Sequence, residues 1–188
     1  MSQRITVDEY LAMPESTRPM ELVFGVVREP PAPRYGHQSV VTHLGAMLDR
    51  HLRETGLGVV AVAPVDVVLD RDRRLVVQPD LIVILAARRH IIGGQVWGAP
   101  DLVVEVLSRR TAPRDKGVKL GWYRRYGVRE CWLVDPSART VRIVSLGNRV
   151  RAAESLADRR RSTRFAGPAR LRSDVLPDFN PRALEIFA

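Results

Sequence analysis

Apolar residues recur along the chain with two periods, and changes of period mark the predicted elements. Helical spacing predicts helices over residues 6–13, 37–55, 114–126 and 181–187. In the second of these, apolar residues recur at helical intervals, and the pattern stops before Gly56, a common residue at helix ends. In the first, Thr6 and Glu9 have the spacing of a capping box.

Aliphatic, β-branched runs predict strands over residues 21–28, 59–69, 75–85, 101–107, 130–134 and 140–145. The charged segment DRDRR (70–74) joins the second and third runs and predicts an antiparallel pair. Asp135-Pro136-Ser137 predicts the turn of another hairpin, and Gly25 predicts a turn or bulge within the first run. Strands that alternate with helices indicate one α/β domain over residues 1–188 with a mixed sheet.

Composition excludes several classes of protein. The sequence contains no run of about 18 apolar residues that could cross a membrane. Cys131 is the single cysteine, so an intramolecular disulfide and a multi-cysteine zinc site are both excluded. The first 16 residues are amphipathic and acidic and lack the apolar core of a secretory signal, so we expect a cytoplasmic protein.

The chain carries a formal net charge of +9, which favours a polyanionic partner such as nucleic acid. A solvated surface rich in arginine is the alternative, and the arginines of residues 159–172 fit either interpretation. Of the 30 basic residues only Lys116 and Lys119 are lysines, and they lie together in DKGVK. Lysine is a compact point charge, whereas arginine is a planar fork, so this pair indicates a place where an ammonium group is needed; chance is the competing explanation.

Two carboxylates lie within otherwise apolar strands. Asp80 opens the run QPDLIVIL, and Glu105 lies midway along PDLVVEVLS. Alternation puts Glu105 on one face with Asp101 and Val103, and the opposite face is expected to point to the core. Opposed residues on paired strands have Cβ atoms about 4.5–5.5 Å apart, so Asp80 and Glu105 can converge on a divalent metal such as Mg²⁺ or Mn²⁺. Alternatively, both acids cap strand ends or pair with surface arginines.

The predicted helix after this strand adds a lysine. Asp115, Lys119 and Tyr123 have i, i+4, i+8 spacing and share one face. If the helix folds back beside the strand, Lys119 comes near Glu105. Two acids and a lysine around a metal are typical of phosphodiester cleavage. The simpler alternative is an Asp115–Lys119 ion pair on the helix surface, worth about 0.3–0.5 kcal/mol.

The ordered motifs of the chain resemble the Uma2 family (also called DUF820), restriction-endonuclease-like proteins of the PD-(D/E)XK nuclease superfamily. The resemblance covers nearly the whole chain and is carried by ELVFGVV (21–27), GHQ (36–38), QPDLIVI (78–84), APDLVVEVLS (99–108), the D-x-x-x-K-x-x-x-Y spacing and GVRECWLVDP (127–136). It implies a restriction-endonuclease-like core, with a mixed central sheet flanked by helices.

The resemblance also implies roles for individual residues. Asp80 and Glu105 are the expected metal-binding acids, with Glu21 as an accessory acid and the carbonyl of Val106 as a further metal ligand. Lys119 is the expected catalytic lysine, and the predicted substrate-binding residues are His37, Gln38, Ser108 and Tyr123. One departure matters: the superfamily expects lysine two residues after the second acid, where this chain has Leu107.

These features predict an Mg²⁺- or Mn²⁺-dependent endonuclease that hydrolyses phosphodiester bonds of DNA, with Lys119 in place of the missing strand lysine. A homodimer is compatible with this prediction. The alternative is a catalytically inactive nuclease-fold module that binds nucleic acid or a protein partner, and Leu107 is the feature that favours it.

Overall fold

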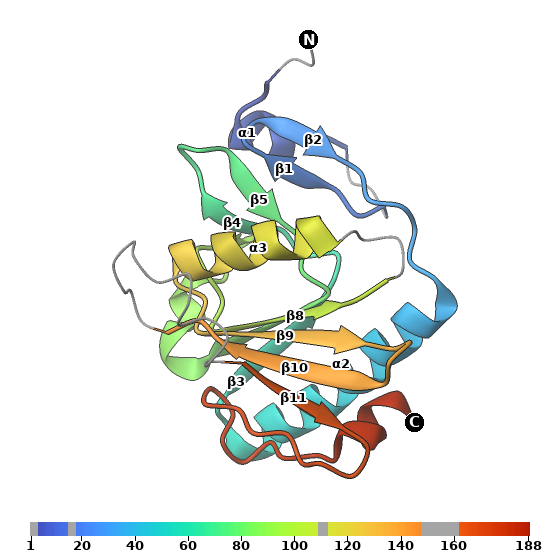
Figure 1. Cartoon of the computed structure of the whole chain (residues 1–188). Helices are drawn as coiled ribbons and strands as arrows, with labels where there is room; N and C mark the ends of the chain where they lie inside the picture. The colour runs from blue at the N-terminus through green and yellow to red at the C-terminus, as the bar shows by residue number, and fades with distance from the viewer. Residues whose placement is uncertain (1–3, 15–17, 109–112, 148–161) are drawn as a thin grey trace.

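The computed structural model of the chain contains two β-sheets with a helix between them (Figure 1). It describes residues 4–14, 18–108, 113–147 and 162–188. One sheet has five strands in the order β2-β1-β5-β4-β7, and the other has six in the order β11-β10-β9-β8-β6-β3. Both are mixed, because β4 pairs in parallel with β7, and β8 pairs in parallel with β9. The predicted α/β class is confirmed, and the five-stranded sheet is an addition to the expected central sheet.

Within the described residues, the helices are α1 (Val7–Leu11), α2 (Tyr35–Thr55), the 3-10 helix η1 (Ala86–Ile91), α3 (Pro113–Tyr126) and the 3-10 helix η3 (Ala183–Phe187). The strands are β1 (Glu21–Val23), β2 (Val26–Arg28), β3 (Gly58–Val62), β4 (Val67–Asp70), β5 (Leu75–Val77), β6 (Leu81–Leu85), β7 (Val96–Trp97), β8 (Leu102–Val106), β9 (Glu130–Asp135), β10 (Thr140–Ser145) and β11 (Ser162–Ala166).

Local sequence signals account for the helix ends. Thr6 and Glu9 form the predicted capping box: the Thr6 hydroxyl accepts from the Glu9 N–H at 3.2 Å, and Glu9 accepts from the Thr6 N–H at 2.7 Å. Gly56, at the end of α2, has a φ of +67°, a left-handed conformation that glycine adopts without steric cost. The predicted helix at 181–187 is a 3-10 helix. Of the basic segment 159–172, residues 159–161 lie outside the described part of the chain, and residues 162–166 form β11.

The predicted pair of long strands is present but divided between the two sheets. Near the DRDRR turn, β4 pairs with β5 in the five-stranded sheet. Farther from the turn, β3 pairs with β6 in the six-stranded sheet. Residues 63–66 and 78–80 connect the two halves, so the hairpin passes from one sheet to the other. This passage places Asp80 where the two sheets meet.

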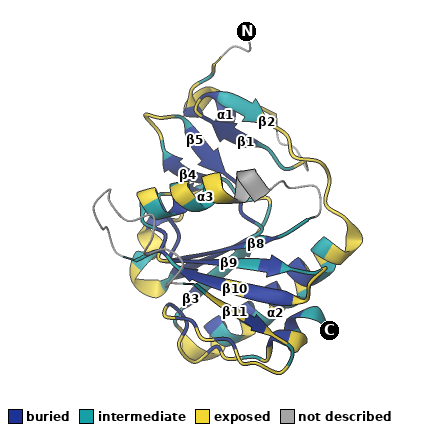
Figure 2. Cartoon of the chain, viewed as in Figure 1, coloured by how far each residue is buried: buried dark blue, intermediate teal, exposed yellow. Residues whose placement is uncertain are grey.

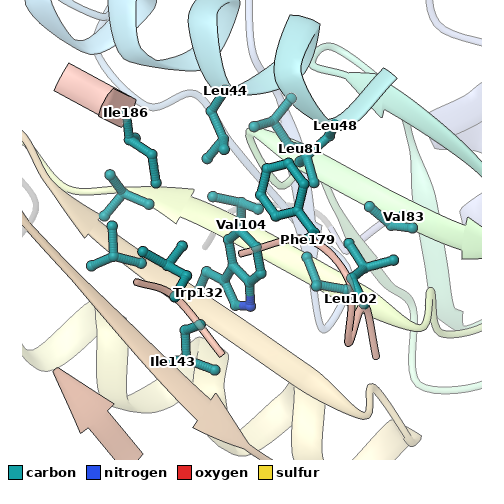
Figure 3. Packing of buried hydrophobic residues seen from close by; sticks show 14 of the residues in the cluster. Leu44, Leu48, Leu81, Val83, Leu102, Val104, Trp132, Ile143, Phe179 and Ile186 are labelled. Atoms are coloured by element: carbon teal, nitrogen blue, oxygen red, sulfur yellow. The ribbon is translucent and has the colours of Figure 1, made fainter. Parts of the chain in front are cut away.

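Both faces of the six-stranded sheet are covered. One face packs against α2 and η3: Leu44 and Leu48 of α2 lie over Val104 and Trp132 of the sheet (Figure 3). The other face packs against α3, which lies between the sheets, while α1 packs on the outer face of the five-stranded sheet (Figures 1 and 2). The prediction of a core on the Leu102, Val104 and Val106 face is confirmed, but Val103 on the opposite face is also fully buried, because α3 covers it.

Two buried acids secure the ends of the central strands. Asp101 lies directly before β8, and its Oδ2 accepts from the Leu85 N–H at 2.9 Å. Glu130 opens β9 and is 1% exposed. Its Oε1 accepts from the Trp132 indole and the Ser173 hydroxyl, each at 2.6 Å, and its Oε2 accepts from the Asp174 N–H at 2.9 Å. Glu130 thereby fastens the C-terminal segment to the sheet.

Glu130→Gln is expected to lower the free energy of unfolding by about 1–3 kcal/mol, because the amide –NH₂ is a donor and leaves a buried N–H or O–H without its acceptor. Urea unfolding monitored by circular dichroism measures the change. Glu54→Gln, at an exposed position of α2, is the matched control and should leave stability within about 0.5 kcal/mol of wild type. Equal stability of both variants would contradict this role for Glu130.

Candidate active site

Three carboxylates approach one another at the junction of the two sheets. Glu21 is the first residue of β1, Asp80 directly precedes β6, and Glu105 is the second-last residue of β8. Leu81 pairs with Val104 in the antiparallel β6–β8 ladder, so continuing the register by one residue sets Asp80 opposite Glu105. Val106 is the last residue of β8, and its N–H donates to Asp80 Oδ2 at 2.7 Å. The strand pairing thus brings together the two acids that the sequence singles out.

Lys119 of α3 joins the carboxylates. Its Nζ lies 2.7 Å from Glu21 Oε1 and 3.3 Å from Glu105 Oε1. The Tyr123 hydroxyl, one turn farther along α3, donates to the same Glu105 oxygen. The predicted shared face of Lys119 and Tyr123 therefore points at Glu105. The backbone of Asp115 is helical, but its side chain lies outside the described part of the structure, so the alternative of an Asp115–Lys119 ion pair is not tested.

The predicted substrate-binding residues are distributed around this centre. His37 lies in the first turn of α2, and its Nε2 is 3.3 Å from Asp80 Oδ2, while its Nδ1 is 3.2 Å from Gln38 Oε1. Gln38 is exposed, and Ser108 lies two residues beyond Val106, where it is partly buried. Tyr123 is 1% exposed, so it can orient Glu105 but offers little surface to a substrate.

Sequence patterns missed a layer of polar residues behind Glu21. The Gln78 N–H donates to Glu21 Oε1 at 3.2 Å, and the Gln78 side-chain amide donates to Asp66 Oδ1 at 3.0 Å. The Tyr10 hydroxyl donates to the same Asp66 oxygen at 3.1 Å. Asp66 alternates with valines in PVDVVLD, a pattern that marks only an ordinary strand position. Its partners are 12 and 56 residues away, a separation that periodicity does not reveal.

The charges of the site shift the pKa values of its groups. Burial raises the pKa of Glu105; the Lys119 ammonium opposes this, and the nearby Asp80 carboxylate adds to it. Burial acts to lower the pKa of Lys119, but the Glu105 and Glu21 carboxylates outweigh burial, and its pKa lies above the ordinary value. Lys119 is therefore protonated at neutral pH and acts as a cation and hydrogen-bond donor, not as a base.

His37 responds to the same carboxylates. Burial acts to lower the pKa of His37, and the hydrogen bond and charge of Asp80 overcome that effect, so its pKa is raised. The side chains of His37 and Asp80 are 12% and 20% exposed, and those of Glu105 and Lys119 are 18% and 23% exposed. Solvent and small ions can therefore reach the cluster.

The cluster has oxygen donors that suit a hard divalent cation. Asp80 makes its contacts through Oδ2, whereas Glu105 and Glu21 make theirs through Oε1. No three His, Cys, Asp or Glu side chains in the described ranges form a metal-ligand group. Mg²⁺ commonly binds one or two protein carboxylates and keeps several waters.

Comparison with known proteins supplies the family. A model of the Uma2 family, described as "Putative restriction endonuclease", matches residues 7–181. The chain belongs to the Uma2 family. This Uma2 chain also superposes on a crystal structure described as a putative nuclease belonging to DUF820 from Anabaena variabilis ATCC 29413, with a TM-score of 0.77, 17% identity and 97% coverage of each chain. No curated protein matches it.

The family match and the structural likeness confirm the resemblance and the nuclease fold that the sequence predicts. The roles assigned to individual residues of this Uma2 chain stay predictions, which its geometry makes testable. None of the helices that the structure describes has the length and apolar character needed to cross a bilayer.

Glu105→Gln should gain stability relative to wild type as pH rises from about 4 to 8. The pKa of Glu105 is raised in the folded protein, so its contribution to stability is present below the unfolded pKa and lost as pH rises through the folded pKa. The glutamine keeps an acceptor for Tyr123 and has no proton to lose. Thermal unfolding in EDTA across this pH range measures the difference, with Glu54→Gln as control. A difference independent of pH would show that Glu105 titrates normally.

Proposed function

We propose that this Uma2 chain is a divalent-metal-dependent endonuclease that hydrolyses DNA phosphodiester bonds. The observation that carries the proposal is the Lys119 ammonium, which contacts Glu21 and Glu105 beside Asp80. An ammonium within a cluster of acids is the arrangement expected where a phosphate is bound and attacked. The nuclease family and fold of the chain support nucleic acid as the substrate, and the net charge of +9 favours its approach.

The metal ligands that we propose are the carboxylates of Asp80 and Glu105 and the backbone carbonyl of Val106, with Mg²⁺ or Mn²⁺ as the ion. When bound, the ion supplies Lewis acidity, which polarises the phosphodiester and lowers the pKa of water. Burial raises the pKa of Glu105 and the Asp80 carboxylate adds to this effect, so a cation held by both acids would favour the ionised form of Glu105.

The chain's own residues position the reactants. Lys119 is held between Glu21 and Glu105. It donates a hydrogen bond to the attacking water or to a phosphate oxygen, and its positive charge stabilises the negative charge that builds up there. Tyr123 holds the Glu105 carboxylate, and the Val106 N–H and His37 hold Asp80. Glu21, supported by the Gln78 N–H, keeps Lys119 in place. Attack in line with the leaving oxygen then needs no further protein nucleophile.

One observation favours the alternative function, an inactive module that binds nucleic acid or a protein partner. Leu107 stands where the superfamily expects lysine, and its N–H is used in a hydrogen bond to the Val134 carbonyl at 2.7 Å. In our proposal Lys119 replaces that lysine from the neighbouring helix. A homodimer would supply the two sites needed to cut both strands of a duplex.

Purified protein should nick and linearise plasmid DNA with Mg²⁺ or Mn²⁺, and EDTA should abolish this activity. Asp80→Ala, Glu105→Ala and Lys119→Ala should each lower the rate by about 100-fold or more, because each removes a charge that acts on the reacting phosphate. Asp49→Ala removes an acid that pairs with Arg53 on α2 and should keep wild-type activity. Cleavage that resists EDTA, or full activity in the Asp80 and Glu105 variants, would refute the proposed nuclease.

Calorimetric titration with Mn²⁺ separates the two functions. An active metal site predicts heat of binding in wild type and its loss in Asp80→Ala, while Asp49→Ala titrates normally. The inactive module predicts no heat at millimolar Mn²⁺, together with an Asp80→Ala variant that is more stable and binds DNA unchanged, because an uncompensated acid has been removed.

A further inference from the structure

A second feature lies beside the candidate site: an aromatic pair formed by Phe24 and Trp122. Phe24 is in the turn between β1 and β2, and Trp122 is on α3. Their ring centroids are 5.7 Å apart, and their planes meet at 89°. Phe24 is 40% exposed, and Trp122 is partly buried. The pair therefore presents aromatic surface to solvent.

The aromatic pair lies next to the acid–lysine cluster along the chain, just after β1 and on α3. Glu21 of β1 contacts Lys119 of α3. Phe24, in the turn that follows β1, contacts Trp122, which lies three residues beyond Lys119 on α3. Three residues span about 4.5 Å along a helix, which is the spacing between Lys119 and Trp122 along the α3 axis. Stacked nucleotides rise about 3.4 Å each, so the pair lies within a few nucleotides of a phosphate held at Lys119.

The backbone of Phe24 is unusual for a bulky residue. Its φ is +51°, in the left-handed region, where a side chain with a Cβ costs on the order of 1–2 kcal/mol and where Asn or Gly is common. Full burial of the side chain does not offset this cost, because Phe24 is 40% exposed as a residue. A large exposed ring in a strained turn indicates a binding role.

Basic residues surround the turn. Arg4 and Arg74 flank the adjacent Gly25: a Cβ built there would lie 3.1 Å from Arg4 Cβ and 3.2 Å from Arg74 Cδ. Arg125, three residues beyond Trp122, lies over the Tyr126 ring at 5.9 Å from its centroid. Glu9 is the acid that interacts with Arg74, and its carboxylate already accepts the hydrogen bonds of the capping box. Exposed aromatic rings among arginines are typical of surfaces that bind single-stranded nucleic acid.

We propose that Phe24 and Trp122 form a stacking site for an unpaired nucleobase of a single DNA strand whose backbone reaches the Lys119 cluster. The proposal rests on the proposed function for the identity of that cluster, and it adds that the preferred substrate has an unpaired base near the cleaved phosphate. Stacking does not require cleavage, so it can be measured with the metal removed.

Tryptophan fluorescence of the full chain in EDTA, titrated with an oligothymidylate of about 12 nucleotides, tests the stacking. The chain has three tryptophans, Trp97, Trp122 and Trp132. Trp132 is fully buried, and Trp97→Phe removes the exposed Trp97, so Trp122 remains as the tryptophan that a ligand can reach. In the Trp97→Phe background, the oligonucleotide should quench Trp122 saturably, and a duplex of matched length should bind more weakly. No quenching, or equal quenching by the duplex, would overturn the proposal.

Phe24→Asn in the same background separates binding from folding. Asparagine removes the ring and tolerates the left-handed turn, so the thermal midpoint should stay the same or rise while the affinity for the oligonucleotide falls about tenfold or more. Trp97→Asn in the otherwise wild-type chain, monitored with a labelled oligonucleotide, is the control: Trp97 is also 40% exposed, and its loss should leave affinity unchanged. Unchanged affinity in Phe24→Asn, or equal losses in both variants, would overturn the stacking site.

A lower thermal midpoint in Phe24→Asn that accompanies its loss of affinity would also count against the proposal, because the pair would then be a folding contact. Plasmid cleavage by a Phe24→Asn variant of unchanged DNA affinity would leave the nuclease proposal intact and remove the stacking site alone. Stacking in a chain that never cleaves DNA would support the stacking site and refute the nuclease proposal.

Discussion

The contact of one lysine with two carboxylates from different sheets is the interaction on which the site depends. Lys119 bonds to Glu21 of the five-stranded sheet and to Glu105 of the six-stranded sheet. Without the ammonium, the acids at this junction would repel one another in a partly buried setting and lower the stability of the fold. Such a cluster of acids is commonly a sign of a functional site. Apolar residues of α3 pack between the sheets, and Lys119 of the same helix offsets the negative charge of Glu21 and Glu105.

Much of the fold was predictable because its signals are local. The capping box at Thr6, the end of α2 at Gly56 and the β9–β10 hairpin each depend on residues a few positions apart. The convergence of Asp80 with Glu105 and the approach of Lys119 were also predicted, because strand pairing and helix periodicity carry those residues to one place.

Other features were beyond the sequence because they depend on long-range packing. The 59–85 hairpin is divided between two sheets, and α1 and α3 cover the two faces of the five-stranded sheet. The alternation of residues within the strands does not reveal this division. The sequence neighbours of Asp66 do not reveal its partners, Tyr10 and Gln78, which come from other parts of the chain. The Phe24–Trp122 contact joins residues 98 positions apart, and no period relates them.

The central claim is that Lys119 replaces the strand lysine that is absent at Leu107, in a centre whose ion is held by Asp80 and Glu105. A crystal structure of the protein soaked in Mn²⁺, with anomalous scattering recorded from the manganese, tests it most directly. The account predicts one manganese ion bound to carboxylate oxygens of Asp80 and Glu105, with the Lys119 ammonium beside a water of that ion. An anomalous signal elsewhere, or a Lys119 side chain turned away from the ion, would contradict it.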